Sequence, residues 1–176
     1  MAPQLAKPAL NQLIAVIQKY QAAMIAEINP ALPMIEEFHK GPKYRTAFPW
    51  VTLAYEGTAF DESSEQTRKQ QILIVLTLES GQFDSELAQD QAIDYLRVLD
   101  SIITYSAGPS PFWTDWETAL PIVHETVPSG VTVPFTAGSV KEIFIEHEEQ
   151  SLVLKDEIET PVIQVSLQIR FDLEEV

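Results

Sequence analysis

One apolar stretch constrains the fold of this chain more than any other feature. Residues 71–78 read Gln-Ile-Leu-Ile-Val-Leu-Thr-Leu. A β-strand places alternate side chains on opposite faces, so one face of this strand carries Ile72, Ile74, Leu76 and Leu78. The other face carries Leu73 and Val75. Because both faces are apolar, both are expected to be shielded from water. Helices of the same chain would cover one face, and a neighbouring element or a second copy would cover the other.

Two segments show the three- and four-residue apolar spacing of amphipathic helices. The first is residues 9–28, which Pro30 ends because proline disfavours helical geometry in the residue before it. The second is residues 85–105, which follow the apolar strand. The predicted buried stripe of this second helix is Leu87, Ala92, Ile93, Leu96, Leu99, Ile102 and Ile103.

Strand patterns occupy much of the remaining chain. Residues 50–79 predict a β-hairpin with a polar tip. Residues 30–49 are interpreted as a linker, with a short helical turn at residues 34–40. In the carboxyl third, residues 140–173, we predict a strand that begins near Ile143, a short strand at residues 152–154 and a long strand at residues 162–173. This last segment alternates most cleanly, and its predicted inward residues are Ile163, Val165, Leu167, Ile169, Phe171 and Leu173.

This order of elements predicts an α+β domain spanning residues 1–176. The expected architecture is an antiparallel or mixed β-sheet with both helices packed on one face. A long insertion, residues 105–139, interrupts the pattern with five prolines and two tryptophans. Its aromatic side chains provide apolar area to bury and therefore argue against disorder: Phe112, Trp113, Trp116 and Phe135. Two interpretations stay open, a lid packed on its own domain and an arm that contacts a neighbouring molecule.

Charge narrows the range of partners. The formal net charge is −15 and the isoelectric point is about 4.4. Such an acidic chain repels phosphate backbones and anionic headgroups, so neither a membrane nor sequence-specific nucleic acid is expected as a partner. The absence of cysteine, of a signal-peptide pattern and of a long apolar run predicts a soluble, cytoplasmic protein. The charge is also uneven, with net +2 over residues 1–49, −10 over 50–140 and −7 over 141–176. This asymmetry could orient head-to-tail packing of identical copies, although an ordinary solvated acidic surface also explains it.

No motif points to catalysis, a metal or a cofactor. His39, His124 and His147 lie far apart in the sequence, and on a regular strand His147 would point away from Glu146 and Glu148. A cation site at Asp61, Glu62 and Glu65 would lack the glycine turn of a calcium loop. The sequence contains no nucleophile elbow, phosphate-binding loop or dinucleotide fingerprint. We therefore expect a protein that is not an enzyme and binds no cofactor.

Several segments of the sequence resemble those of tail terminator and tail-completion proteins of long-tailed bacteriophages and prophages. They are residues 71–80, residues 92–103, and the closing pair of residues 140–146 and 161–171. The resemblance implies a ring, usually a hexamer, that caps the tail tube, stops its polymerisation and joins it to the head. Its partners would be the tail tube protein and head–tail connector proteins, in the host cytoplasm during assembly and then in the virion tail. The aromatic insertion is longer than this family needs, which leaves another neck or tail-completion protein as an alternative.

The interface residues expected under this interpretation are Leu73, Val75, Phe112, Trp113, Trp116 and Phe135. A different class also fits the composition. An acidic, non-catalytic binding module of the immunity or inhibitor type would mask a basic partner, with fast, electrostatically steered association.

Overall fold

A computed structural model describes residues 5–41, 49–61, 69–81, 85–103, 122–123, 137–154 and 161–175. Its elements, in chain order, are α1 (Ala6–Ile28), β1 (Glu37–Lys40), β2 (Trp50–Asp61), β3 (Lys69–Gly81), α2 (Ser85–Ile103), β4 (Ile122–Val123), β5 (Ala137–Leu154) and β6 (Pro161–Glu175). The strands form one sheet in the order β1-β2-β3-β6-β5-β4. Only β1 pairs in parallel among these strands, so the sheet is mixed and the α+β prediction is confirmed.

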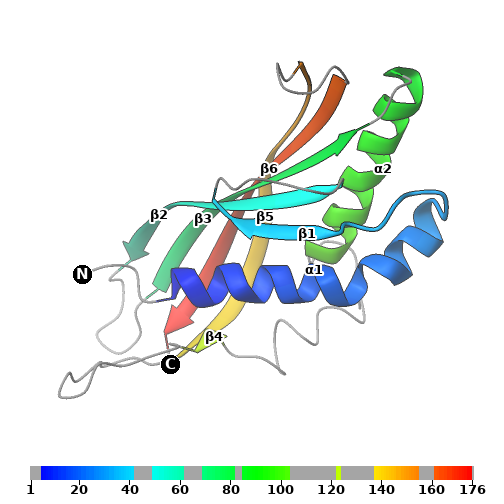
Figure 1. The fold of residues 1–176 in the computed structure, drawn as a ribbon. Coiled ribbons are helices and arrows are strands. Elements are labelled where there is room, and N and C mark those ends of the chain that lie inside the picture. The colour runs from blue at the N-terminus through cyan, green and yellow to red at the C-terminus, as the bar shows by residue number, and fades with distance from the viewer. Residues whose placement is uncertain are drawn as a thin grey trace.

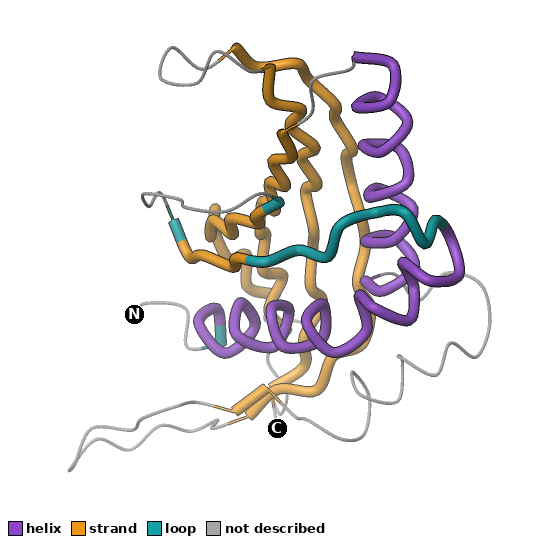
Figure 2. Tube along the Cα trace, turned by 45° about the vertical axis from the view of Figure 1, so that its right-hand side comes forward, coloured by secondary structure: helices purple, strands orange, loops and turns teal. Residues whose placement is uncertain are grey.

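Both helices pack against the same face of the sheet. In Figures 1 and 2, α2 runs roughly along β5 and β6, while α1 crosses these two strands. The predicted alternation of β3 and β6 holds where the structure describes their side chains. The buried residues that these two strands contribute to the core are Ile72, Ile74, Leu76, Leu78, Val165, Leu167, Ile169, Phe171 and Leu173. This continuous apolar face explains why two amphipathic helices are held there.

The predicted stripe of α2 is confirmed at Ala92, Leu99, Ile102 and Ile103, and Leu96 packs partly buried against the core, but two of its positions are wrong. Leu87 and Ile93, which were expected inside, are 48% and 45% exposed. The buried side of the helix instead carries Ala88, Ala92, Tyr95, Val98, Leu99, Ile102 and Ile103. Aliphatic side chains occur on both sides of this helix, and the inner stripe also uses two alanines and a tyrosine. Counting aliphatic residues therefore selected Leu87 and Ile93 and left out Ala88 and Tyr95.

The predicted linker contains an element that the sequence reading missed. Residues 37–40 form the parallel edge strand β1, where Phe38 pairs with Val51, instead of part of a helical turn.

The segment before β1 is held in place by side-chain hydrogen bonds from both helices. The buried Gln21 donates from Nε2 to the Ile35 carbonyl at 3.2 Å and accepts from the Ile35 amide at 2.8 Å. The Tyr95 hydroxyl donates to the Pro33 carbonyl at 2.6 Å, and burial raises the pKa of this hydroxyl well above its ordinary value. These bonds join both helices to the chain that enters β1.

Replacing Gln21 with alanine should therefore be costly. It would leave the amide and carbonyl of Ile35 without their buried partner, and each unsatisfied buried group costs about 1–3 kcal/mol. We expect Gln21→Ala to lower the free energy of unfolding by about 2–4 kcal/mol in urea titrations. The matched control is Gln18→Ala, because Gln18 is exposed on the same helix. Equal stability of the two variants would show that the Gln21 bonds are not needed.

The carboxyl third also differs from the prediction. Residues 137–154 form one long strand, β5, where two shorter strands were expected. The strand stays paired with β6 through two irregularities of register, one after Val140 and one after Ile145. It begins inside the predicted insertion, which also contributes β4; the rest of that insertion lies outside the described residues. The predicted hairpin is present as β2 and β3, with a bulge between Tyr55 and Gly57.

Candidate assembly surface

The face of the sheet opposite the helices is only partly covered in a single chain. We call it the open face. Its centre is a cross-strand row in which Gly57 of β2, Leu73 of β3, Arg170 of β6 and Phe144 of β5 are successive partners. A neighbouring row contains Ala54, Val75 and Gln168. Leu73 and Val75 are half-buried, whereas Ile72 and Ile74 on the helix side are fully buried.

The difference between the two faces of β3 follows from its neighbours. Glycine and alanine on β2 give Leu73 and Val75 little cover, so their apolar side chains remain partly accessible. Phe144 on β5 is also 36% exposed. Together these residues leave an apolar area in the middle of this face, beside the charged side chains of Glu146, Arg170 and Asp172. An apolar area with a polar rim is typical of protein–protein contact sites.

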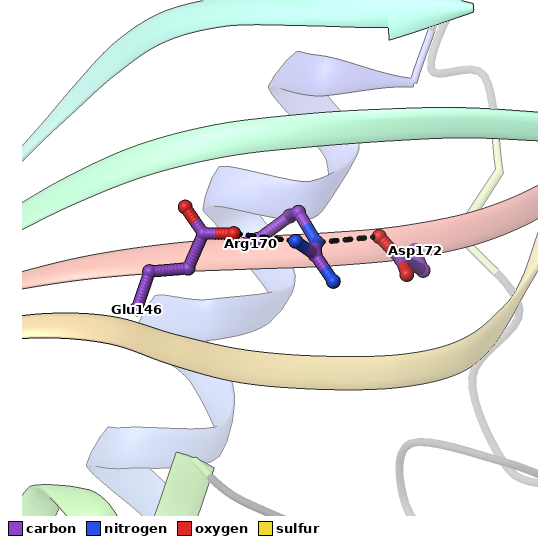
Figure 3. Close-up of polar contacts among 3 residues, drawn as sticks. All are labelled: Glu146, Arg170 and Asp172. Atoms are coloured by element: carbon purple, nitrogen blue, oxygen red, sulfur yellow. Dashed lines mark hydrogen bonds and ion pairs between the residues drawn. The ribbon is translucent and has the colours of Figure 1, made fainter. Parts of the chain in front are cut away.

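Arg170 lies at the centre of the open face and pairs there with two carboxylates. Figure 3 shows its side chain between Glu146 of β5 and Asp172 of its own strand, in front of the sheet and with α1 behind it. The guanidinium donates from Nη1 to Glu146 Oε1 at 2.5 Å and from Nε to Asp172 Oδ1 at 3.0 Å. Its central carbon also lies 4.4 Å from the centroid of the Phe144 ring. Because these groups remain about a quarter to a third exposed, the ion pairs fix geometry more than they add stability.

A shallow groove lies beside this cluster. Its volume is about 420 Å³, and it is lined by Gly57, Thr58, Ala59, Gln71, Leu73, Glu146 and Arg170. A Cβ atom added at Gly57 would meet no atom within 4 Å beyond its chain neighbours, so the groove is open above this residue. The charged groups in the lining already pair with each other, and no nucleophile lies beside a base. The groove has room for an added side chain above Gly57.

The bulge after Ile145 corrects the predicted geometry of residues 146–148. Glu146 reaches Arg170 on the open face, and His147 pairs with Gln168 of the same face. Glu148 instead lies in the row of Leu167, on the helix side. The three residues therefore still do not share one face. Glu146 and His147 lie on the same face, however, whereas a regular strand would place them on opposite faces. Within the described residues, no cluster of three or more histidine, aspartate or glutamate side chains could hold a metal ion.

The structure places the predicted interface residues unequally. Leu73 and Val75 lie side by side on the open face, in adjacent rows. Phe112, Trp113, Trp116 and Phe135 lie outside the described residues, as do His124 and the acidic tip that contains Glu62 and Glu65. The sequence patterns predicted no role for Arg170, Phe144 or Gly57. Their alignment across the sheet depends on the register of four strands, which no single segment of sequence contains. Arg170 could still have been singled out, because it is the one basic residue in 161–176.

Similarity to known proteins is found at the level of the fold. No protein-family model matches the sequence, and no curated protein does. The fold is similar to that of a chain in a solved structure described as the virion of a native gene transfer agent (GTA) particle. The TM-score is 0.52 at 10% sequence identity, and the match covers 92% of this chain and 91% of that chain. At this identity the similarity establishes a common fold, over nearly the full length of both chains.

The described helices give no sign of a membrane span. Neither α1 nor α2 combines the length and the hydropathy that crossing a bilayer requires.

Proposed function

We propose that this chain is a structural component of a phage-like virion and acts by assembly without catalysis. The observation that carries the proposal is the fold match to a chain of a gene transfer agent virion, which covers 92% of this chain. The open face supports it, because its partly accessible apolar centre suits a contact between proteins. The lack of a nucleophile, metal or phosphate motif in the sequence is consistent with a stoichiometric role.

Within such a particle, the role that fits best is that of a tail terminator or tail-completion protein. In this role, copies form a ring, possibly a hexamer, on the head-proximal end of the tail tube, where they stop its growth and join the head. The tail tube protein and head–tail connector proteins would be the partners. The net charge of −15 favours this role over tight DNA binding, because acidic groups around a lumen repel DNA and ease its passage.

The contact residues proposed for this assembly come from two regions. Leu73 and Val75 supply the apolar centre of the open face, and a neighbouring molecule would complete their burial. Phe112, Trp113, Trp116 and Phe135 supply the second region, an aromatic arm that docks on a neighbour. Tryptophan is enriched among the residues that dominate binding energy at protein interfaces, which supports the assignment of this arm.

Deleting the gene from its phage or prophage tests the function directly. If the chain terminates tails, electron microscopy of the deletion strain should show tails of uncontrolled length that fail to join heads. Restoring the gene should return both tail length and head joining to normal. Tails of normal length would reject the terminator role, and tails of normal length without heads would favour another neck protein.

A further inference from the structure

One long strand edge of the sheet is uncovered. Strand β4 pairs with β5 only through Ala137 and Gly138. Among the described residues, no strand lies against the outer side of β5 from Ser139 to Leu154. The inner side of β5 is paired with β6 along nearly its full length. An uncovered strand edge offers unpaired backbone groups to another chain, so a protein needs some means of keeping it from pairing.

The middle of β5 contains residue types that favour strand pairing. Ile143, Phe144 and Ile145 are consecutive, and β-branched and aromatic residues are enriched in strands. Phe144 is 36% exposed and Ile145 is half-buried. Both side chains would lose exposed apolar surface if another strand were added beside β5. The backbone and this apolar run therefore both favour the addition of a strand.

Glutamates flank the apolar run on both sides. Four of them are exposed along the strand: Glu142, Glu146, Glu148 and Glu149. They are not confined to one face of the sheet, because Glu142 pairs with Asp172 of the open face whereas Glu148 pairs with Leu167 of the helix side. Charged residues beside an apolar strand are a common means by which proteins keep a strand edge from pairing.

A second copy of the chain is the simplest partner for such an edge, because in a two-fold contact the same surface serves on both copies. In a regular antiparallel pair of β5 with β5, the position of the centre determines which residues face each other. Centres at residues 145, 146 and 147 place Glu142 opposite Glu148, Glu146 opposite Glu146, and Glu146 opposite Glu148, respectively. Like charges directly opposite each other destabilise an antiparallel pair. Each of these three registers is therefore opposed by charge repulsion.

We propose that β5 is a latent self-pairing edge, which its glutamates keep from joining β5 of a second copy. The irregularities after Val140 and Ile145 act in the same direction, because they interrupt the regular spacing that an added strand would need. The inference rests only on the sheet edge and its charges, so it does not depend on the proposed function. It assigns these glutamates the task of preventing one unwanted contact between copies.

Removing the charges tests this role. A full-length variant with Glu142→Gln, Glu148→Gln and Glu149→Gln keeps Glu146, which pairs with Arg170. We expect dimerisation of this variant in sedimentation velocity to be about tenfold tighter or more than that of wild type, because each removed charge occurs twice in a two-fold contact. The control, Glu27→Gln with Glu56→Gln and Asp90→Asn, changes the net charge equally at exposed positions away from β5. If the two variants associate alike, the proposal is overturned.

Cross-linking shows which surface pairs, since the chain has no cysteine of its own. Residue 147 is exposed and lies within two positions of all three centres. With a flexible bis-maleimide, His147→Cys should give abundant covalent dimer when added to the triple variant and little in the wild-type background. About 1 M salt, which shortens the Debye length to about 3 Å, should increase the dimer in the wild-type background. Gln18→Cys, exposed on α1, should give little dimer in either background. Tighter association of the triple variant without a dimer at residue 147 would show that another surface pairs, and it would overturn the proposal.

Discussion

Leu167→Asp should prevent stable folding. Leu167 is fully buried in β6, paired with Leu76 of β3, and it belongs to the core beneath the helices. An aspartate there would place a carboxylate without a partner in the apolar layer. A buried, unpaired charge is among the few single changes that cost more than about 4–5 kcal/mol, and a domain of this size has only about 5–15 kcal/mol in total. We expect no cooperative melting transition by circular dichroism near neutral pH.

The adjacent residue provides a matched control. Gln168 is half-buried on the open face, so Gln168→Asp introduces the same carboxylate one position along the same strand. We expect it to change the melting temperature by no more than a few degrees, since its charge stays in contact with water. Similar melting of the two variants would mean that the strand faces have been assigned the wrong way round.

The sequence predicted β6 well because its pattern is long and has a single period. Over residues 163–173, apolar and polar residues alternate, and a shift of one position would expose every apolar side chain. Likewise α1 ends where Pro30 requires it to, and it begins at Ala6, three residues before the predicted start. In both cases, local chemistry and burial favour the same structure.

Other elements depend on contacts between distant residues and could not be read locally. Strand β1 has only four residues, and its parallel pairing with β2 determines its conformation. The bulge at Glu146 interrupts a stretch whose sequence shows no break. It places this carboxylate beside Arg170, which is 24 positions away in the chain. The arrangement at the centre of the open face therefore depends on how β2, β3, β6 and β5 are aligned with one another. The periodicity of a single strand does not contain this information.

The second prediction concerns the open face, whose apolar residues are half-buried, unlike the fully buried Leu167. The double variant Leu73→Gln with Val75→Gln should leave the fold intact but impair assembly. Both side chains are half-buried on a face that the helices do not cover, so glutamine there keeps much of its contact with water. We expect a loss of a few degrees in melting temperature for the single chain. If a neighbour buries these two residues, removing them should weaken self-association or binding to the tail tube by about 30-fold or more, the effect of a typical interface hot spot.

The appropriate control removes similar apolar surface elsewhere. Leu87 and Ile93 are exposed on α2, so Leu87→Gln with Ile93→Gln changes composition in the same way on the other side of the molecule. It should leave self-association close to wild type. A third variant, Gly57→Phe, adds a ring where a new Cβ meets no atom within 4 Å, and it should obstruct the groove beside Leu73 without disturbing the core. Assembly that tolerates both open-face variants would show that this face stays in solvent, because no bound partner could accommodate lost apolar contacts and a filled groove alike.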